Sequence, residues 1–278
     1  MIDLHTHTTV SDGSDPPAAI PGLAAAAGCT AVALTDHDSL DGLAEARGTA
    51  ESIGIELVPG CELSCETEGQ ALHLLVYFVD LGDGPLQDEL GRLRDIRDER
   101  NRRMVEALVG LGLPVTWDEL QAEAGGTGAG RPHAAAVLVR KGVVASVQEA
   151  FDVWLAKGRP AYVEKERLSP ATAIELALAS GGVPVLAHPL TLGRGPDLSS
   201  AVDELATLGL VGLEAWYGRY EPEEREMLAG LAGEHGLVAT GGSDHHGTYK
   251  PDLSVGVGRG DLSVPDQCLE DLRDRIPT

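Results

Sequence analysis

Short apolar segments alternate with helical segments along most of this chain, and this alternation constrains its fold more than any other feature. The apolar segments are too continuous in Val, Leu, Ile and Ala to be half exposed, as is typical of parallel strands buried on both faces. The pattern predicts an α/β fold of about seven parallel strands joined by helices. The strands are expected at 2–4, 31–35, 56–59, 71–79, 183–187, 211–214 and 237–240, with a further short one at 255–257.

The alternation stops after the fourth predicted strand. A long charged helical stretch runs from 86 to 113, and two capping boxes, Thr116–Glu119 and Ser146–Glu149, each indicate the start of a short helix. The glycine-rich segment Gly125–Gly130 matches neither a dinucleotide-binding nor a Walker A motif, and we interpret it as a hinge or lid connection. The predicted domains are a barrel, residues 1–80 and 166–278, and an inserted helical domain, residues 81–165.

His, Asp and Glu side chains follow the predicted strands. His5 and His7 are two residues apart on an extended segment, so both side chains point to one side and can reach one metal ion. The carboxyl ends of parallel barrel strands meet at one mouth, and that face holds the active site. The candidate metal ligands are His5, His7, Asp12, His37, Glu62, His73, His188, Asp244 and His246.

The chemistry of these ligands indicates a hydrolytic centre. Nitrogen and carboxylate oxygen donors without thiolates suit Zn²⁺, Mn²⁺ or Fe²⁺. Eight or nine ligands exceed the roughly four to six that one ion accepts, so we expect two to three divalent metal ions. His73 is the exception to the pattern, because it lies inside the fourth strand, where a lone histidine is more often a core residue.

The composition limits the partners of the protein. A net charge of −23 at pH 7 disfavours binding of long duplex nucleic acid, which requires a basic face. It does not exclude a small phosphorylated ligand, because bound metal ions would be the largest local charges. The four cysteines contain no Cys-x-x-Cys pair and are interpreted as reduced thiols. Without a signal peptide or an apolar run of membrane length, we expect a cytoplasmic protein with no membrane partner.

At these positions the chain resembles the PHP (polymerase and histidinol phosphatase) family of metal-dependent phosphoesterases. The resemblance implies a distorted (β/α)₇ barrel, similar to a TIM barrel, with a trinuclear metal centre. It extends over the whole chain, and its motifs occur in the order of the family. The matching segments are Asp3–His7, Ser11–Gly13, Thr35–His37, Glu62 with His73, Ala187–Pro189 and Gly242–His246.

The resemblance also implies how the ligands divide among three metals. His5, His7, Glu62 and Asp244 would hold the first metal. Glu62 would bridge to a second, which His73 and His188 would also hold, and Asp12, His37 and His246 would hold the third. Asp12 stands where other members of the family place a histidine, a change that affects the metal preference of the third position.

Three of the residues near these motifs are predicted to act in catalysis. His188 is one candidate to protonate the leaving oxygen, and a metal-bound water is the other. Asp244 is a predicted ligand of the first metal. Asp36 is interpreted as a partner that fixes a histidine tautomer from outside the ligand set.

The inserted helices look like those of the family branch that acts on nucleoside phosphates and short oligonucleotides. Arg131-Pro-His133 resembles the phosphate-binding element of that branch, and Arg suits bidentate phosphate contact; the alternative is a helix start with a surface Arg. Of the many arginines in 86–113, we retain Arg97, Arg100 and Arg103, which share a helix face. The predicted substrate-binding residues are Arg131, His133, Trp216, Tyr217 and Glu214, of which the two aromatic side chains would stack a base or else pack in the core.

The sequence therefore predicts a metal-dependent phosphoesterase in which a metal-bridging hydroxide attacks phosphorus. The expected substrates are nucleoside phosphates, such as nucleoside 3′,5′-bisphosphates or AMP, or short single-stranded 5′-phosphorylated oligonucleotides. A histidinol phosphatase or another small-molecule phosphomonoesterase is the main alternative, which the inserted helices disfavour. An amidohydrolase would carry a bridging lysine, and no lysine ends a strand. A non-catalytic metal-binding interaction module would lack ligands, and none is missing.

Overall fold

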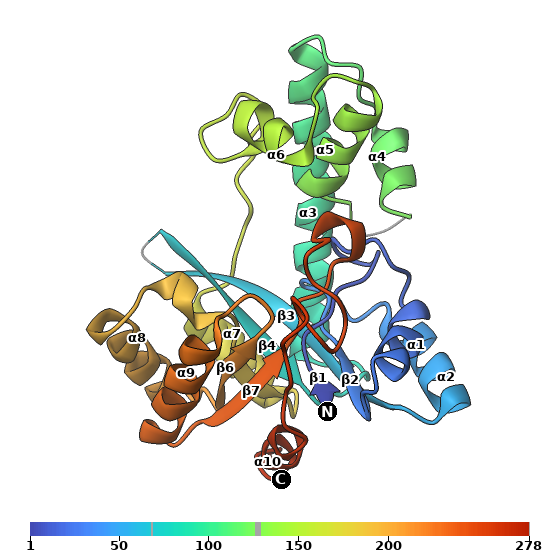
Figure 1. Ribbon diagram of the computed structural model, residues 1–278. Coiled ribbons are helices and arrows are strands. Elements are labelled where there is room, and N and C mark those ends of the chain that lie inside the picture. The colour runs from blue at the N-terminus through green and yellow to red at the C-terminus, as the bar shows by residue number, and fades with distance from the viewer. Residues whose placement is uncertain (68, 126–128, 278) are drawn as a thin grey trace.

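Seven strands form one sheet that nearly closes into a barrel (Figure 1). The structure is a computed structural model and describes residues 1–67, 69–125 and 129–277. The sheet order follows the chain order from β1 to β7. The strands are β1 Ile2–Asp3, β2 Ala31–Leu34, β3 Glu56–Thr67, β4 Gln70–Tyr77, β5 Val183–Leu186, β6 Gly212–Tyr217 and β7 Val238–Gly242.

The barrel closes where the chain after β1 meets β7. The Leu4 amide donates to the Gly241 carbonyl at 3.1 Å, and the Asp244 amide donates to the His5 carbonyl at 2.8 Å. A Cβ atom on Gly242 would lie 2.3 Å from the His5 nitrogen, closer than any side chain permits. Glycine at this position therefore lets β7 approach the segment that carries the first two predicted ligands.

The prediction of parallel strands is wrong for β4, which pairs antiparallel with both β3 and β5. In addition, β3 continues well past its expected end at Pro59, so Glu62 lies within the strand and not at its end. Because β4 runs in reverse, its first half lies beside the second half of β3, and His73 pairs with Ser64. This reversal explains the one exception in the sequence pattern, since it brings His73 to the same mouth as the other predicted ligands.

The helices of the barrel lie outside the sheet (Figure 1). The described residues 255–257 do not form the expected strand. An isolated bridge joins Ser254 to Gly258 at this place. No helix in the described parts is long and apolar enough to cross a membrane. The helices are α1 Ala19–Ala26, α2 Leu43–Ile53, α7 Pro170–Ala179, α8 Pro196–Thr207, α9 Pro222–Glu234 and α10 Gln267–Arg273, with short 3₁₀ turns η2 Pro189–Leu192 and η3 Gly247–Tyr249.

The helices of the insertion lie above the barrel (Figure 1), and their apolar side chains form a small core of their own. Thr116 begins α4 with the predicted capping box, and Ser146 caps α6 by accepting from the Glu149 amide. The segment interpreted as a hinge or lid includes residues 126–128, which lie outside the described residues. The elements are α3 Pro85–Gly110, α4 Trp117–Glu123, α5 Arg131–Arg140, α6 Val147–Ala150 and the π-helical turn η1 Phe151–Leu155.

Helix α3 belongs to both parts of the molecule. Leu86 and Leu93 in its first half pack into the barrel core, together with residues of α7. Met104 and Leu108 in its second half pack into the core of the insertion. The continuous helix therefore connects the two cores, and its middle turns stand beside the mouth of the barrel.

Candidate metal centre and substrate cleft

The structure brings the nine predicted ligands together at the mouth of the barrel. Within the described residues, three overlapping sets of side chains have donor atoms close enough to share an ion, and His188 lies 3.0 Å from Glu62 at their edge. The sets are His7, Asp12, His37 and His246; His5, His7 and Asp244; and His37, Glu62 and His73.

Glu62 lies at the centre of the cluster. Its Oε1 is 2.9 Å from His73 Nδ1 and 3.0 Å from His188 Nε2, while its Oε2 is 3.1 Å from His7 Nε2 and 3.2 Å from His37 Nδ1. The carboxylate is 1% exposed. His5 Nε2 also lies 3.3 Å from Oε2, so each oxygen faces a different group of imidazoles, which is the arrangement that a bridging carboxylate needs.

Asp12 faces the outer side of the cluster, toward the insertion. Its Oδ1 lies 3.2 Å from His246 Nε2, and its Oδ2 lies 3.8 Å from His37 Nε2. Burial disfavours its ionised form, yet the nearby His246 and His37 hold the pKa of Asp12 well below its usual value. Asp12 is thus ionised, as a ligand of the third metal implied by the family resemblance would have to be.

The charges of the cluster favour bound cations. Burial alone would raise the pKa of Glu62 and of Asp244, but surrounding imidazoles and, for Asp244, Lys250 lower both pKa values well below their usual range. The buried His37 Nδ1 lies 3.2 Å from Glu62 Oε2 but makes no hydrogen bond with a described residue. Ionised carboxylates and free imidazole nitrogens form a donor set that fits divalent metals such as Zn²⁺, Mn²⁺ and Fe²⁺.

Glu214 has a different place from the substrate-binding one that we predicted. Its side chain is fully buried, and it accepts hydrogen bonds from His5 Nδ1 at 2.8 Å and from the His188 amide at 2.7 Å. It offers no surface to a substrate. Instead it holds His5 in the tautomer whose Nε2 is free to bind metal.

A bulge in β6 favours the second of the two alternatives for the aromatic residues, packing in the core over stacking on a base. The pairing with β7 slips between Glu214 and Trp216, so that Tyr217 points to the side of the site. Trp216 packs against the apolar cores. Tyr217 is buried and donates to Asp244 Oδ2 at 2.7 Å, so its ring is not free to stack a base.

Asp36 contacts the cluster through a neighbour. It accepts hydrogen bonds from the Thr8 amide at 2.8 Å and from Ser11 Oγ at 2.6 Å. Ser11 Oγ in turn lies 3.4 Å from His7 Nδ1. Because Ser11 donates to Asp36, it is left to accept from His7, and the tautomer effect predicted for Asp36 would act through this hydroxyl.

Left-handed backbone gathers around the cluster. Of the four non-glycine residues with positive φ in the described ranges, His188 (φ 29°) and Asp244 (φ 56°) are predicted ligands, and Asp38 (φ 50°) follows the predicted ligand His37. Such conformations cost about 1–3 kcal/mol each and persist where surrounding contacts enforce them. Their concentration here is typical of a functional site.

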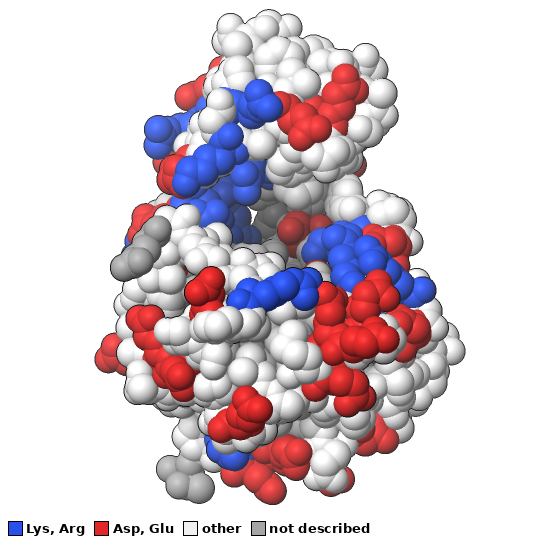
Figure 2. All heavy atoms as spheres, turned by 60° about the vertical axis from the view of Figure 1, so that its left-hand side comes forward, with Lys and Arg blue, Asp and Glu red and all other residues white. Residues whose placement is uncertain are grey.

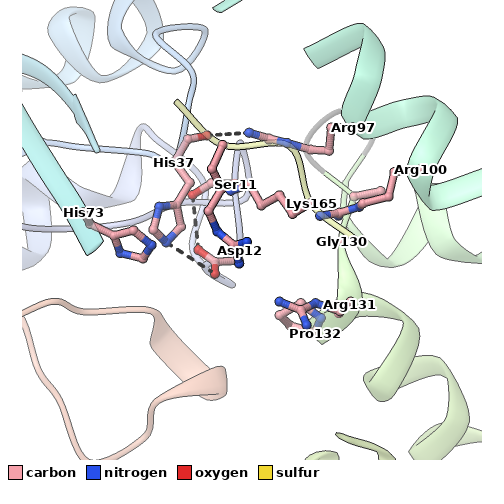
Figure 3. A pocket seen from close by; sticks show the side chains of 12 residues that line it. Ser11, Asp12, His37, His73, Arg97, Arg100, Gly130, Arg131, Pro132 and Lys165 are labelled. Carbon is pink, nitrogen blue, oxygen red and sulfur yellow. Dashed lines mark hydrogen bonds and ion pairs between the residues drawn. The ribbon is translucent and has the colours of Figure 1, made fainter. Parts of the chain in front are cut away.

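A cleft of about 220 Å³ separates the cluster from the insertion, and its two walls differ in charge (Figure 3). Figure 2 shows Lys and Arg side chains gathered along the hollow between the two parts of the molecule. The barrel contributes Ser11, Asp12, His37 and His73 to the lining. The opposite wall contributes Arg97, Arg100, Arg131, Lys165 and Arg167.

Of the predicted phosphate-binding pair, Arg131 lines this cleft and His133 is fully buried. His133 Nδ1 accepts from the Gly130 amide at 3.1 Å at the start of α5. The proton of the neutral ring is then on Nε2, which is buried without a hydrogen-bond partner among the residues described. His133 therefore holds the start of α5 and does not line the cleft in this structure.

Four functional residues were missed in the sequence. Lys165 and Arg167 line the cleft but stand in the mixed-charge run Glu164–Arg167, a pattern that is also typical of solvated surface. Lys250 Nζ lies 2.6 Å from Asp244 Oδ2, and only its nearness to the Gly242–His246 motif could have indicated it. Asp38 directly follows a predicted ligand, but its partners come from distant segments.

Comparison with known proteins agrees with this geometry. The PHP domain pattern matches residues 3–109. A 5′-3′ exoribonuclease of Haemophilus influenzae is 34% identical over 245 residues, which cover 88% of this chain and 89% of the relative. A 3′,5′-nucleoside bisphosphate phosphatase of Chromobacterium violaceum is 32% identical over 257 residues, covering 92% of this chain and 90% of the relative. The solved structure of a Bifidobacterium adolescentis protein, provisionally assigned as a metal-dependent phosphoesterase, has a TM-score of 0.87 at 31% identity and covers 100% of this chain and 96% of its own.

The barrel, the His, Asp and Glu cluster at its mouth and these likenesses define a metal-dependent hydrolase of phosphate esters. The distorted barrel and the enzyme class predicted from the sequence are confirmed. The chain belongs to the PHP family.

Proposed function

We propose that this protein hydrolyses the phosphate ester of a nucleotide that carries a second phosphate group. Nucleoside 3′,5′-bisphosphates and short 5′-phosphorylated oligonucleotides have this chemistry. The observation that carries the proposal is the cleft with a predicted metal cluster on one wall and five cationic side chains on the other. The names of the relatives from Chromobacterium violaceum and Haemophilus influenzae support the same substrate class.

Two cations of the cleft are suited to bind the second phosphate. Arg100 and Arg131 make no ion pair with a carboxylate among the described residues. Arg100 is 9% exposed and donates only to Asn101 Oδ1. Burial, together with the neighbouring Arg131 and Arg97, lowers the pKa of Arg100 to about 10. A buried cation without an anion is unfavourable, and a phosphate group would relieve this cost.

The donor set supports two to three divalent ions, Mn²⁺, Zn²⁺ or Fe²⁺, held by the nine clustered side chains as the family resemblance implies. Such ions neutralise charge on the phosphoryl oxygens and lower the pKa of an attacking water. His188 and Asp244 take part in catalysis as members of this set.

The surrounding residues hold the ligands in a productive arrangement. Glu214 keeps His5 Nε2 free, and Ser11 does the same for His7 Nε2. Tyr217 and Lys250 both donate to one oxygen of Asp244, which leaves the other oxygen for the cluster. Because Glu214, Ser11 and Tyr217 are buried, the ligand geometry is set before substrate binds.

A substrate panel tests the proposal. Phosphate release from adenosine 3′,5′-bisphosphate, AMP and histidinol phosphate would be measured with the Mn²⁺-loaded protein, and nucleotide release would be measured from short RNA with and without a 5′-phosphate. We expect kcat/KM to be at least about tenfold higher for substrates with a second phosphate, since a charged hydrogen-bonded pair contributes about 1.5–3 kcal/mol. Equal values for the bisphosphate and for histidinol phosphate would refute the proposal and favour a general phosphomonoesterase.

Substitution of one arginine connects this preference to the cleft. Arg131→Ala should remove most of the advantage of the second phosphate by raising KM. Arg94→Ala is the matched control, because Arg94 lies on α3 outside the cleft in an exposed ion pair with Asp41. An equal loss in both variants would show that the effect is not specific to the cleft.

A further inference from the structure

Asp38 connects the metal cluster to the insertion. Its side chain is 2% exposed, and it accepts hydrogen bonds from the Ser64 amide at 2.8 Å and from Ser64 Oγ at 3.0 Å. Ser64 lies on β3 two residues beyond Glu62, and Asp38 follows His37. The carboxylate is therefore held by the same two segments that carry predicted ligands.

The same carboxylate also pairs with cations from both connections of the insertion. Arg97 Nη2, from α3, lies 3.2 Å from Asp38 Oδ2 and also donates to the His37 carbonyl at 2.9 Å. Lys165 Nζ, from the segment that returns to the barrel, lies 2.9 Å from the same oxygen and also contacts Ser64 Oγ. One buried carboxylate thus joins the outgoing helix and the returning segment to the barrel.

The five cations of the cleft consequently fall into two groups. Arg97 and Lys165 are held by Asp38, and Arg167 is held by Glu66 at 2.7 Å. Arg100 and Arg131 have no such carboxylate within the described ranges. Each anchored cation has its charge paired by a buried or half-buried carboxylate, whereas the other two have no carboxylate partner among the described residues.

We propose that Asp38 is a positioning residue that sets substrate specificity, because it fixes the insertion and its phosphate-binding arginines at a defined distance from the metal cluster. The inference rests on the proposed function for its substrate, a nucleotide with a second phosphate. Asp38 touches neither that phosphate nor the reacting one. It acts through Arg97 and Lys165, which hold α3 and the returning segment in place.

The sign of one kinetic change separates this role from a simple effect of charge. Asp38→Asn removes one negative charge near the cleft, which by electrostatics alone would tighten phosphate binding and lower KM. If Asp38 positions the insertion, the loss of its ion pairs displaces the arginines and raises KM. Asn tolerates a positive φ nearly as well as Asp, so the substitution suits the local backbone.

The kinetic test compares Asp38→Asn with Asp41→Asn. Asp41 pairs with Arg94 of the same helix, but both side chains are about half exposed. For adenosine 3′,5′-bisphosphate we expect Asp38→Asn to raise KM about tenfold while kcat changes less than about threefold. Asp41→Asn should stay within about twofold of the parent protein. A KM that is unchanged or lower in Asp38→Asn would overturn the inference, as would an equal rise in both variants.

A second measurement does not depend on the substrate. Amide hydrogen exchange of the Mn²⁺-loaded variants should be faster in the returning segment 161–168 of Asp38→Asn than of Asp41→Asn. Lys165→Met, which removes the partner and keeps the carboxylate, should show the same direction if Asp38→Asn does not fold. Equal exchange in the variants refutes the positioning role, even if the preference for a second phosphate holds. Loss of that preference in the parent protein refutes the proposed function instead.

Discussion

The barrel and the insertion differ most in charge. The predicted insertion, residues 81–165, contains 12 of the 21 Lys and Arg residues and 13 of the 44 Asp and Glu residues, which leaves 9 and 31 for the predicted barrel. The barrel places three of its carboxylates in the predicted metal cluster, whereas the insertion turns cations toward it across the cleft. The site thus lies between two walls of opposite charge. Metal ions would balance the carboxylates of the barrel wall, and a phosphate group would balance the cations of the insertion wall.

The largest effect is expected from removing the central carboxylate of the barrel wall. Glu62→Gln should lower kcat by about 10³-fold or more, because both of its oxygens face imidazoles of the cluster. Elemental analysis should show fewer metal ions per chain. Glu56→Gln, on the same strand but exposed and paired with Arg273, is the control and should keep full activity. Full activity of Glu62→Gln would contradict the assignment of this wall.

The barrel wall should also make the metal-free protein sensitive to pH. Burial disfavours protonated His7, but hydrogen bonds to Asp244 and Glu62 outweigh it and raise the pKa of His7 to about 9. A raised pKa stabilises the fold below the unfolded value of about 6.5, and this stabilisation, about 3 kcal/mol at most, is lost as the pH rises through 9. Thermal unfolding of chelator-treated protein should therefore show a falling Tm between pH 7 and 9.

At lower pH, and with metal bound, the stability of the fold should change with pH in the opposite direction. Burial lowers the pKa of His37, His73 and His246, so their protonation should destabilise the metal-free fold as the pH falls below about 6.5. His7 must lose its proton to bind Mn²⁺. The stability of the Mn²⁺-loaded protein should therefore rise between pH 7 and 9, the range in which the metal-free protein becomes less stable. A Tm of the metal-free protein that still rises from pH 7 to 9 would contradict these assignments.

A moderate effect is expected on the insertion wall. Arg100→Met should raise KM for a bisphosphate about tenfold, because it removes one of the two cations without a carboxylate partner. It should also leave the free energy of unfolding unchanged or raise it by about 1 kcal/mol, since a buried unpaired charge is replaced by an apolar side chain. Denaturant unfolding and steady-state kinetics check the two parts. A destabilised variant with an unchanged KM would show that Arg100 is structural.

The smallest effect is expected from a residue that supports the barrel wall. Tyr217→Phe removes the hydrogen bond to Asp244 and should lower kcat by about three- to tenfold, since a hydrogen bond to a charged group contributes about 1.5–3 kcal/mol and Lys250 still holds the same oxygen. Trp216→Phe should change kcat less, because the bulge turns its ring to the core. Equal losses would indicate that both aromatic residues act through packing.

Local sequence was sufficient for the features that depend on short spacings. The capping box at Thr116 follows from neighbouring residues, as does the side-by-side placement of His5 and His7. The barrel followed from the strand and helix periods together with the motif order. The reversal of β4 could not be predicted, because a buried strand has the same continuous apolar pattern in either direction.

The predicted substrate residues show the other limit. One extra residue in β6 turns Tyr217 toward the site and Trp216 away from it, and no periodicity in the sequence reveals this bulge. Glu214 was expected to meet substrate because it ends a strand, but its partners His5 and His188 come from two other strand ends. These roles depend on contacts between distant segments, which the sequence pattern does not specify.

By itself, the sequence determined the candidate ligands, the strand periods and the family of the chain, because residue type and strand period are local properties. Only the tertiary structure decided which oxygens of Glu62 face which imidazoles, and which cations of the insertion remain without a carboxylate. Asp38 belongs to the second class. Its partners Arg97 and Lys165 are about 60 and 127 residues away, and only the folded chain brings them to one carboxylate.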